Sequence, residues 1–271
     1  MAARYCVIGN PVGHSKSPAI HAAFARQTGQ DIAYERCQAP LDAFAATVQR
    51  LVAEGFNGAN VTVPFKLEAA TICASLSARA QAAGAVNTLL FASGAIAGDN
   101  TDGAGLVNDI VRNAGFDIAG KRVLLLGAGG AARGAILPLL GEQPRELVIA
   151  NRTRATADAL AARFATPACP VSACEFAALE GRFDLIVNAT SASLGGECPP
   201  LPTHVFSAST LALDMMYGNI PTPFMACAGG SGATTRDGLG MLVEQAAEAF
   251  ALWRGVRPDT AEILKSMRAT L

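Results

Sequence analysis

Two side chains that could transfer and steer a proton stand at Lys66 and Asp102. Lys66 lies two residues after a proline at the end of an apolar run, and lysine occurs only four times in the chain. Reduction of a carbonyl group needs a proton for the developing alkoxide, and the reverse reaction needs its removal. Lysine, unlike arginine, can lose its proton at an accessible pH. We therefore expect Lys66 to be the general acid and base and Asp102 to orient it. The alternative is an exposed ammonium at a helix start.

Small hydroxyl and amide groups accompany this pair along the sequence. Ser15 and Ser17 lie in the loop Gly9–Pro18, which follows a short apolar strand. Thr62 ends another strand, and Asn87 lies at the start of an expected hairpin. Such groups suit a small polyhydroxylated carboxylic acid, which needs many directional hydrogen bonds. Because ligands of open α/β folds bind at the carboxyl ends of strands, we expect a substrate site there.

A glycine-rich segment follows the apolar strand 122–126 and opens a helix. Its pattern, G-x-G-x-x-A, is typical of dinucleotide-binding domains, where glycines allow a tight turn and a close approach of backbone N–H groups to a pyrophosphate. The residues of the pattern are Gly127, Ala128, Gly129, Gly130, Ala131 and Ala132. A glycine-rich turn that binds nothing is the alternative.

The end of the next strand, 146–150, indicates which dinucleotide binds. Domains that bind NAD place an acidic residue here for the ribose 2′-hydroxyl. This chain instead has Asn151, Arg152, Thr153 and Arg154. A guanidinium group holds a 2′-phosphate well. The sequence therefore predicts NADP rather than NAD, although Arg154 could also be only a solvated helix residue.

Strand-like and helix-like segments alternate throughout, which predicts an α/β fold with parallel sheets. We expect strands at 4–9, 32–37, 57–62, 122–126, 146–150, 168–171, 184–188, 210–214 and 232–235, and a hairpin of 86–91 and 95–98 about Ser93-Gly94. Helices are expected at 17–28, 41–54, 65–70, 76–82, 102–114, 129–139, 238–253 and 258–269. Ser17 and Asp102 are expected to be helix N-caps, with Pro18 in the first helical position.

Length and composition are those of a protein with two domains. We expect residues 1–102 and 238–271 to form a substrate-binding and catalytic domain and 103–237 to form a Rossmann-type NADP domain, with the active site between them. The net charge of −1 argues against nucleic acid or a membrane as partner. Three histidines and seven scattered cysteines predict no metal site and a reducing cytoplasm. The apolar runs are too short to span a membrane, and the first ten residues do not read as a signal peptide.

Several motifs in this order resemble those of shikimate dehydrogenases over almost the whole chain. They include the loop Gly9–Pro18, the segment Val61–Lys66 and the segment Gly98–Gly103. The resemblance implies reversible, NADPH-dependent reduction of 3-dehydroshikimate to shikimate, in aromatic amino-acid biosynthesis. Hydride would pass between the nicotinamide C4 and the substrate C3.

The resemblance also implies roles for individual residues. The catalytic residues are Lys66 and Asp102, and the substrate residues are Ser15, Ser17, Thr62, Asn87, Tyr217 and Gln245. The cofactor residues are Gly127, Ala128, Gly129, Gly130, Ala131, Asn151, Arg152, Thr153, Arg154, Thr190, Met215 and Gly238.

Other functions remain open from the sequence. A dual-specificity quinate and shikimate dehydrogenase needs room for one more hydroxyl near Ser15 and Ser17. A methylenetetrahydrofolate dehydrogenase also pairs a lysine with a Rossmann domain, although the polar loops argue against a pterin slot. A sensor that binds NADP without catalysis does not need Lys66 and Asp102 together. The expected partner is a small-molecule substrate, and the sequence allows a monomer or a homodimer.

Overall fold

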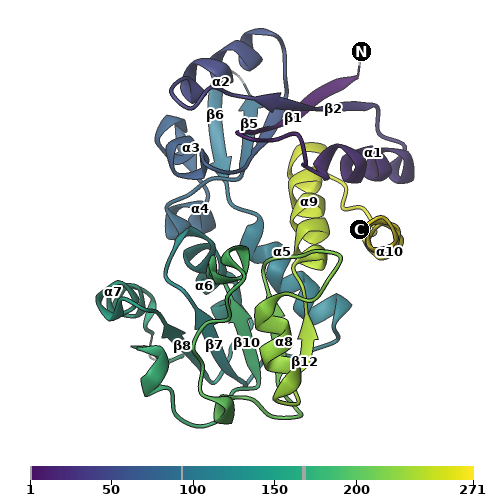
Figure 1. Cartoon of the computed structure of the whole chain (residues 1–271). Coiled ribbons are helices and arrows are strands. Elements are labelled where there is room, and N and C mark those ends of the chain that lie inside the picture. Colours follow the sequence, from purple (N-terminus) through teal and green to yellow (C-terminus); the bar gives the residue numbers. More distant parts are fainter. Residues whose placement is uncertain (1, 93, 167–168) are drawn as a thin grey trace. The chain divides into compact units, whose positions relative to one another are not determined.

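The computed structural model describes residues 2–92, 94–166 and 169–271, which fall into two compact units. The first unit consists of Met1–Gly105 and Val243–Met267, and the second of Leu106–Leu242 and Arg268–Leu271. Each unit is built on its own β-sheet flanked by helices (Figure 1). The chain leaves the first unit after Gly105, returns to it at Val243, and ends with four residues in the second unit.

The sheet of the first unit is mixed, with strand order β2-β1-β3-β5-β6-β4. Its strands are β1 (Ala3–Gly9), β2 (Ile32–Gln38), β3 (Gly58–Val61), β4 (Ser75–Leu76), β5 (Thr88–Ala92) and β6 (Ala95–Asp99). β1 pairs in parallel with β2 and β3, whereas β5 is antiparallel to both β3 and β6. The expected hairpin of β5 and β6 therefore inserts an antiparallel strand into a sheet predicted to be parallel. Ser93, about which the turn was expected, lies outside the described residues.

Helices and a buried cluster complete the first unit. The helices are α1 (Ser17–Thr28), α2 (Phe44–Ala53), α3 (Lys66–Ile72), α4 (Ala78–Ala83), the start of α5 (Asp102–Asn108), most of α9 (Leu239–Arg254) and most of α10 (Ala261–Ala269). Phe44 of α2 and Phe65, the residue before α3, belong to the same core cluster, and their stacked rings are 4.8 Å apart between centroids. This packing fixes α3 and hence its first residue, Lys66.

Two predicted helix caps are wrong. Ser17 and Asp102 are the first residues of α1 and α5 and not their N-caps. The cap position of α1 is Lys16, which makes no side-chain capping bond. Asp102 does not cap because its carboxylate is engaged by other side chains, described below.

An aromatic group encloses His21, on the inner face of α1. The imidazole is fully buried and stacks on Tyr34 at 4.2 Å between ring centroids, with Phe250 and Trp253 nearby. Among the described residues neither ring nitrogen meets a hydrogen-bond partner. Burial lowers the pKa of His21 from 6.5 to about 3, so the folded protein holds this ring neutral.

Stability should therefore fall in mild acid because of His21. The unfolded chain binds a proton at His21 below pH 6.5, whereas the folded protein does not do so until about pH 3. Between pH 7 and pH 5 this linkage removes about 2 kcal/mol of unfolding free energy. Urea unfolding of the wild type and of His21→Phe at both pH values measures the effect. An equal free-energy difference between the two proteins at pH 7 and pH 5 would contradict it.

The second unit has a parallel sheet in the order β12-β11-β10-β7-β8-β9. Its strands are β7 (Arg122–Leu126), β8 (Glu146–Ala150), β9 (Val171–Cys174), β10 (Leu185–Asn188), β11 (Leu211–Asp214) and β12 (Thr234–Arg236). The α-helices α6 (Gly130–Gly141), α7 (Arg154–Phe164) and α8 (Pro223–Gly230) belong to this unit, as does a π-helix at Asp109–Asn113. The four apolar residues of β7 are completely buried, as expected for a central parallel strand.

Most predicted elements lie within a few residues of the observed ones, and three differences matter. The strand expected at 168–171 is β9, at Val171–Cys174, and Ala168 lies outside the described residues. The helix expected at 102–114 changes to a π-helix after Asn108. Helices α7 and α8 and the short strand β4 had no counterpart in the prediction. In the described part of the chain, no helix is both long and apolar enough to cross a membrane.

Candidate active site

Lys66 and Asp102 form an ion pair in the first unit. Lys66 Nζ donates to Asp102 Oδ2 at 2.6 Å, and the two side chains are 33% and 17% exposed. Each is the first residue of a short helix, Lys66 of α3 and Asp102 of α5. The pair is therefore held by two helix starts and stays accessible to a small molecule.

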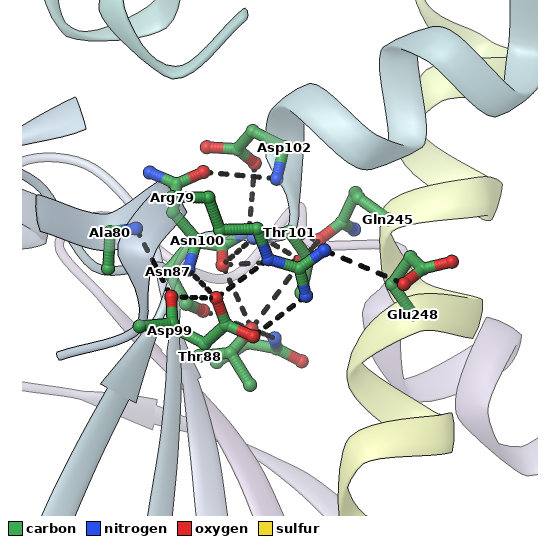
Figure 2. Close-up of polar contacts among 12 residues, drawn as sticks. Arg79, Ala80, Asn87, Thr88, Asp99, Asn100, Thr101, Asp102, Gln245 and Glu248 are labelled. Carbon is green, nitrogen blue, oxygen red and sulfur yellow. Dashed lines mark hydrogen bonds and ion pairs between the residues drawn. The ribbon is translucent and has the colours of Figure 1, made fainter. Parts of the chain in front are cut away.

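The amide of Asn87 has its orientation fixed by its neighbours (Figure 2). Asn87 Oδ1 accepts hydrogen bonds from the backbone N–H of Thr101 at 2.8 Å and from Thr88 Oγ1 at 2.9 Å. Asn87 Nδ2 must then point the other way, where it donates to Asp102 Oδ1 at 2.8 Å. Both oxygens of Asp102 thus accept hydrogen bonds, one from Lys66 and one from Asn87.

Further polar residues extend this network away from Lys66. Asn60, on β3, donates to Thr88 Oγ1 at 3.1 Å, and Tyr34 Oη donates to Asn60 Oδ1 at 2.8 Å. Burial raises the pKa of Tyr34 well above 10, so the phenol keeps its proton. A chain of hydrogen bonds therefore runs from a phenol beneath α1 to the carboxylate beside Lys66.

A second ion pair supports the turn that presents Asp102. Arg79, on α4, makes two hydrogen bonds of 2.7 Å to the carboxylate of Asp99 (Figure 2). Ser77 also donates to this carboxylate. Burial works against the charge of Asp99, but the hydrogen bonds from Arg79 and Ser77 outweigh it and lower the pKa. Asp99 also accepts from the backbone N–H of Asn100, which fixes the start of the turn.

Gln245 reaches the same network from α9. Gln245 Oε1 accepts from Asn87 Nδ2 at 3.3 Å and from Thr101 Oγ1 at 3.4 Å. The close approach depends on Gly105, because a Cβ atom there would lie 2.6 Å from the backbone nitrogen of Gln245. The glycine of α5 therefore allows a helix 140 residues later in the sequence to supply a site residue.

The loop that carries the two serines is tied to the strand end at Thr62. Asn10 N donates to the carbonyl oxygen of Val63 at 3.0 Å, and Ser17 N donates to Ser15 Oγ at 3.3 Å. Arg36, on β2, holds the carbonyl oxygen of Ser15 at 2.8 Å. These bonds hold the start of the loop beside Val63 and hold Ser15 beside β2.

The glycine-rich segment of the second unit forms a turn between β7 and α6. Gly127 has a φ of +101°, a conformation that favours glycine, and its N–H donates to the carbonyl oxygen of Ala150 at 2.8 Å. Gly129 is the N-cap residue of α6 and makes no side-chain capping bond. The N–H groups of the first helical turn thus point out of the helix end, where a cradle of small residues can receive a pyrophosphate. The chain fits a dinucleotide at this place.

Arg152 and Arg154 follow the neighbouring strand β8 and are both exposed. Asn151 Nδ2 donates to the carbonyl oxygen of Thr153 at 2.9 Å, which shapes the turn between β8 and α7. Arg154 Nε lies 3.4 Å from Oδ2 of Asp158, which is one helical turn later. The turn presents guanidinium groups to solvent next to the glycine loop, since β7 and β8 are paired neighbours.

The remaining predicted residues of the second unit follow the ends of β10, β11 and β12. Thr190 Oγ1 donates to Asn188 Oδ1 at 2.7 Å. Met215 follows Asp214, whose carboxylate accepts from Ser193 and Thr222 at 2.6 Å each. A Cβ atom on Gly238 would lie 2.1 Å from the carbonyl oxygen of Met215, so these two segments touch through backbone. Burial and Asp237 raise the pKa of Tyr217, which keeps its phenol neutral.

Within the first unit the structure joins Lys66, Asp102, Asn87 and Gln245 in one network, and it joins Ser15 and Ser17 in one loop. Sequence reasoning missed Tyr34 and Arg79. Tyr34 lies on an edge strand without a motif, and Arg79 lies in an alanine-rich helix. The only signal for either is a polar residue inside an otherwise apolar or small-residue segment.

A parallel sheet with a glycine loop and arginines, together with a lysine–aspartate pair, defines the class of α/β oxidoreductases that use a nicotinamide dinucleotide. Three family models match the chain. Their descriptions are shikimate dehydrogenase substrate binding domain for residues 7–89, shikimate / quinate 5-dehydrogenase for 109–195 and shikimate 5'-dehydrogenase C-terminal domain for 238–268. The chain belongs to the shikimate dehydrogenase family.

Individual relatives agree with this assignment. A shikimate dehydrogenase (NADP(+)) of Janthinobacterium sp. is 61% identical, covering 98% of this chain and 97% of its own. A shikimate dehydrogenase (NADP(+)) of Herminiimonas arsenicoxydans is 62% identical, and the match covers 100% of this chain and 99% of the relative. Among solved structures, an Ael1 enzyme from Pseudomonas putida is 48% identical with a TM-score of 0.94 over 98% of both chains. Shikimate 5-dehydrogenase from Thermus thermophilus in complex with NADP(H) and shikimate is 34% identical, with a TM-score of 0.87. The match covers 99% of this chain and 100% of that one.

Proposed function

We propose that this protein reduces 3-dehydroshikimate to shikimate with NADPH and catalyses the reverse reaction with NADP. The ion pair of Lys66 with Asp102, set among amides and hydroxyls, carries the proposal. Relatives at 61% and 62% identity over nearly their whole length bear the name shikimate dehydrogenase (NADP(+)). NADPH supplies the hydride when it is bound.

The residues of the first unit divide the chemistry between them. Lys66 donates a proton to the substrate oxygen as its carbonyl is reduced and removes it in the reverse direction. Asp102 and Asn87 hold the ammonium in place through the bonds described above. Ser15, Ser17, Thr62 and Gln245 bind the hydroxyl and carboxylate groups, and Tyr217 of the second unit is assigned to the substrate as well.

The residues of the second unit bind the dinucleotide. The backbone of Gly127–Ala131 receives the pyrophosphate, and residues 151–154 receive the adenosine ribose and its 2′-phosphate. Thr190, Met215 and Gly238 complete the nicotinamide end. We assign residues 1–102 and 238–271 to substrate binding and catalysis and 103–237 to NADP binding. The match of residues 7–89 to a substrate binding domain model supports this division.

We also propose that the protein works in the reducing cytoplasm on small molecules, as a monomer or a homodimer. All seven cysteines are free thiols, which suits such a compartment.

Initial rates with shikimate and with quinate, each offered NADP and NAD, test the function. Turnover of shikimate with NADP is the expected result. Comparable turnover of quinate would place the protein in the dual-specificity branch, which the name of the model matching 109–195 also covers. Absence of turnover from a protein that still binds NADP would overturn the proposal and favour a sensor.

Replacing Arg152 with alanine should raise the KM for NADP by about 10- to 100-fold and leave the KM for NAD unchanged. The reason is the loss of a charge-assisted hydrogen bond to the 2′-phosphate, which NAD lacks. Steady-state kinetics with both cofactors measure the effect, and Arg182→Ala, an exposed arginine elsewhere in the second unit, is the control. An equal change for NADP and NAD would remove Arg152 from the phosphate site.

A further inference from the structure

Two cysteines lie side by side in the first unit, away from the residues assigned to catalysis. Cys6 is on β1, and Cys37 is on the neighbouring edge strand β2. Cys6 is in register with Glu35 and Cys37 with Ile8, so the two thiols project from the same face of the sheet. Cys6 is completely buried in the core, and Cys37, which packs against that core, is half-buried.

An arginine from α2 faces Cys37 from the other side. Arg50 Nη2 lies 3.8 Å from Cys37 Sγ, while Arg50 Nη1 donates to Glu54 at 2.7 Å. Half of the Arg50 side chain is exposed, so solutes can reach the sulfur's neighbourhood. Cys37 therefore has the buried Cys6 on the same face of the sheet and a guanidinium beside it.

A pocket of about 190 Å³ opens at this point between the first two strands and the end of α2. The charged and titratable groups around Cys37 come from each packed element. They are Arg4 and Cys6 from β1, Glu35 and Arg36 from β2, Arg50 from α2, and Glu54 just after α2. Arg4 pairs with Glu35, and Arg50 pairs with Glu54. The pocket is thus lined by charge pairs, with one half-buried sulfur in its wall.

These surroundings favour the thiolate form of Cys37. The hydrogen bond from Cys6 lowers the pKa of Cys37 to about 7, with burial opposing and the charge of Arg50 contributing in the same direction. The hydrogen bond with Cys37 and burial raise the pKa of Cys6, so Cys6 remains the protonated donor. One negative charge is therefore held on the outer sulfur of the pair.

We propose that Cys37 is a modification site that reacts with small disulfides entering this pocket. The Cys37 thiolate attacks one sulfur of the disulfide, a new S–S bond forms to Cys37, and the other half leaves as a thiolate. The disulfide is the oxidant, and no other co-reactant is needed. Cys6 keeps its proton and stays a thiol.

The expected rate follows from the thiolate fraction. At pH 7 a thiol with a pKa of about 7 is half ionised, about 50-fold more than one at the ordinary value of 9.0. The lower basicity reduces the intrinsic nucleophilicity by about 10-fold. Cys37 should therefore react with a disulfide about 5-fold faster at pH 7 than an ordinary thiol that is equally accessible, and the ratio of the two rates grows below pH 7.

The second thiol pair of the protein provides a matched control. Cys227 on α8 is exposed and lies beside Cys198. Burial, Cys227 and Asp214 together raise the pKa of Cys198 to about 12. This pair therefore tests whether exposure and a neighbouring thiol alone produce the reactivity.

The experiment follows the reaction of the whole protein with the neutral disulfide 4,4′-dithiodipyridine between pH 5 and pH 9. We expect a fast phase of one equivalent with a midpoint near pH 7, and an adduct mapped to Cys37 by peptide mass spectrometry. Cys37→Ser should remove this phase and Cys227→Ser should retain it. Arg50→Gln, an exposed change, should move the midpoint to higher pH.

Two results would overturn the proposal. One is a first adduct on a cysteine other than Cys37 in the wild type, which requires no variant to fold. The other is a midpoint for Cys37 at the value of an ordinary thiol, unmoved by Arg50→Gln.

Discussion

Replacing Lys66 with alanine should lower kcat for shikimate oxidation by about 10³-fold, because the reaction loses its general base. NADP binding should change little, since Lys66 belongs to the first unit and the glycine loop and arginines to the second. Initial rates give kcat, and titration of NADPH fluorescence gives cofactor affinity. Equal losses of turnover and NADPH affinity would show that Lys66 supports the structure and does not transfer the proton.

Two further lysine variants separate charge from proton transfer. Lys66→Arg keeps a cation for Asp102 but cannot release a proton at an accessible pH, so its kcat should stay low. Lys265→Ala removes an exposed lysine of α10 and should leave kcat unchanged. A Lys66→Arg protein with nearly full activity would assign Lys66 to substrate binding alone.

Replacing Asp102 with asparagine should lower kcat by about 10²- to 10³-fold. Both carboxylate oxygens accept hydrogen bonds, one from Lys66 and one from Asn87. Whichever way the new amide is turned, its NH₂ group faces another donor. Lys66 therefore loses both its counter-charge and its fixed position, and the proton transfer becomes slower.

The pH profile distinguishes this positioning role from a structural one. If Asp102 positions Lys66, Asp102→Asn should change the pH dependence of kcat, while the unfolding free energy falls only modestly. Asp117→Asn, an exposed residue whose side chain caps a turn, is the control. An unchanged profile with a large loss of stability would contradict the assignment.

Much of the second unit could be predicted from the sequence, because its signals are local. An apolar strand, a glycine turn and a helix start lie within the consecutive residues 122–141. The absence of an acid after β8 is equally readable, since residues 151–154 follow the strand directly. The helices α7 and α8 were not predicted, because their apolar spacing is weak: α7 is rich in alanine and α8 is short and glycine-rich.

The first unit depended much more on tertiary structure. The sequence indicated Lys66, Asp102 and Asn87 by residue type and Gln245 through resemblance. These residues are separated by 15 to 158 positions where they bond to one another. Which way the Asn87 amide faces depends on Thr101 and Thr88, and no local pattern encodes it. The helix cap predicted for Asp102 failed for the same reason, because its carboxylate bonds to Lys66.

The sequence by itself determined the types of residue at the strand ends and most of the strands and helices that present them. These follow from local backbone preferences and from the period of apolar residues. Tertiary structure alone decided that a tyrosine on an edge strand and an arginine on α4 support the site, and that Cys6 lies beside Cys37. Such contacts join segments distant in the chain, so packing of the sheet and helices sets them and the local sequence does not.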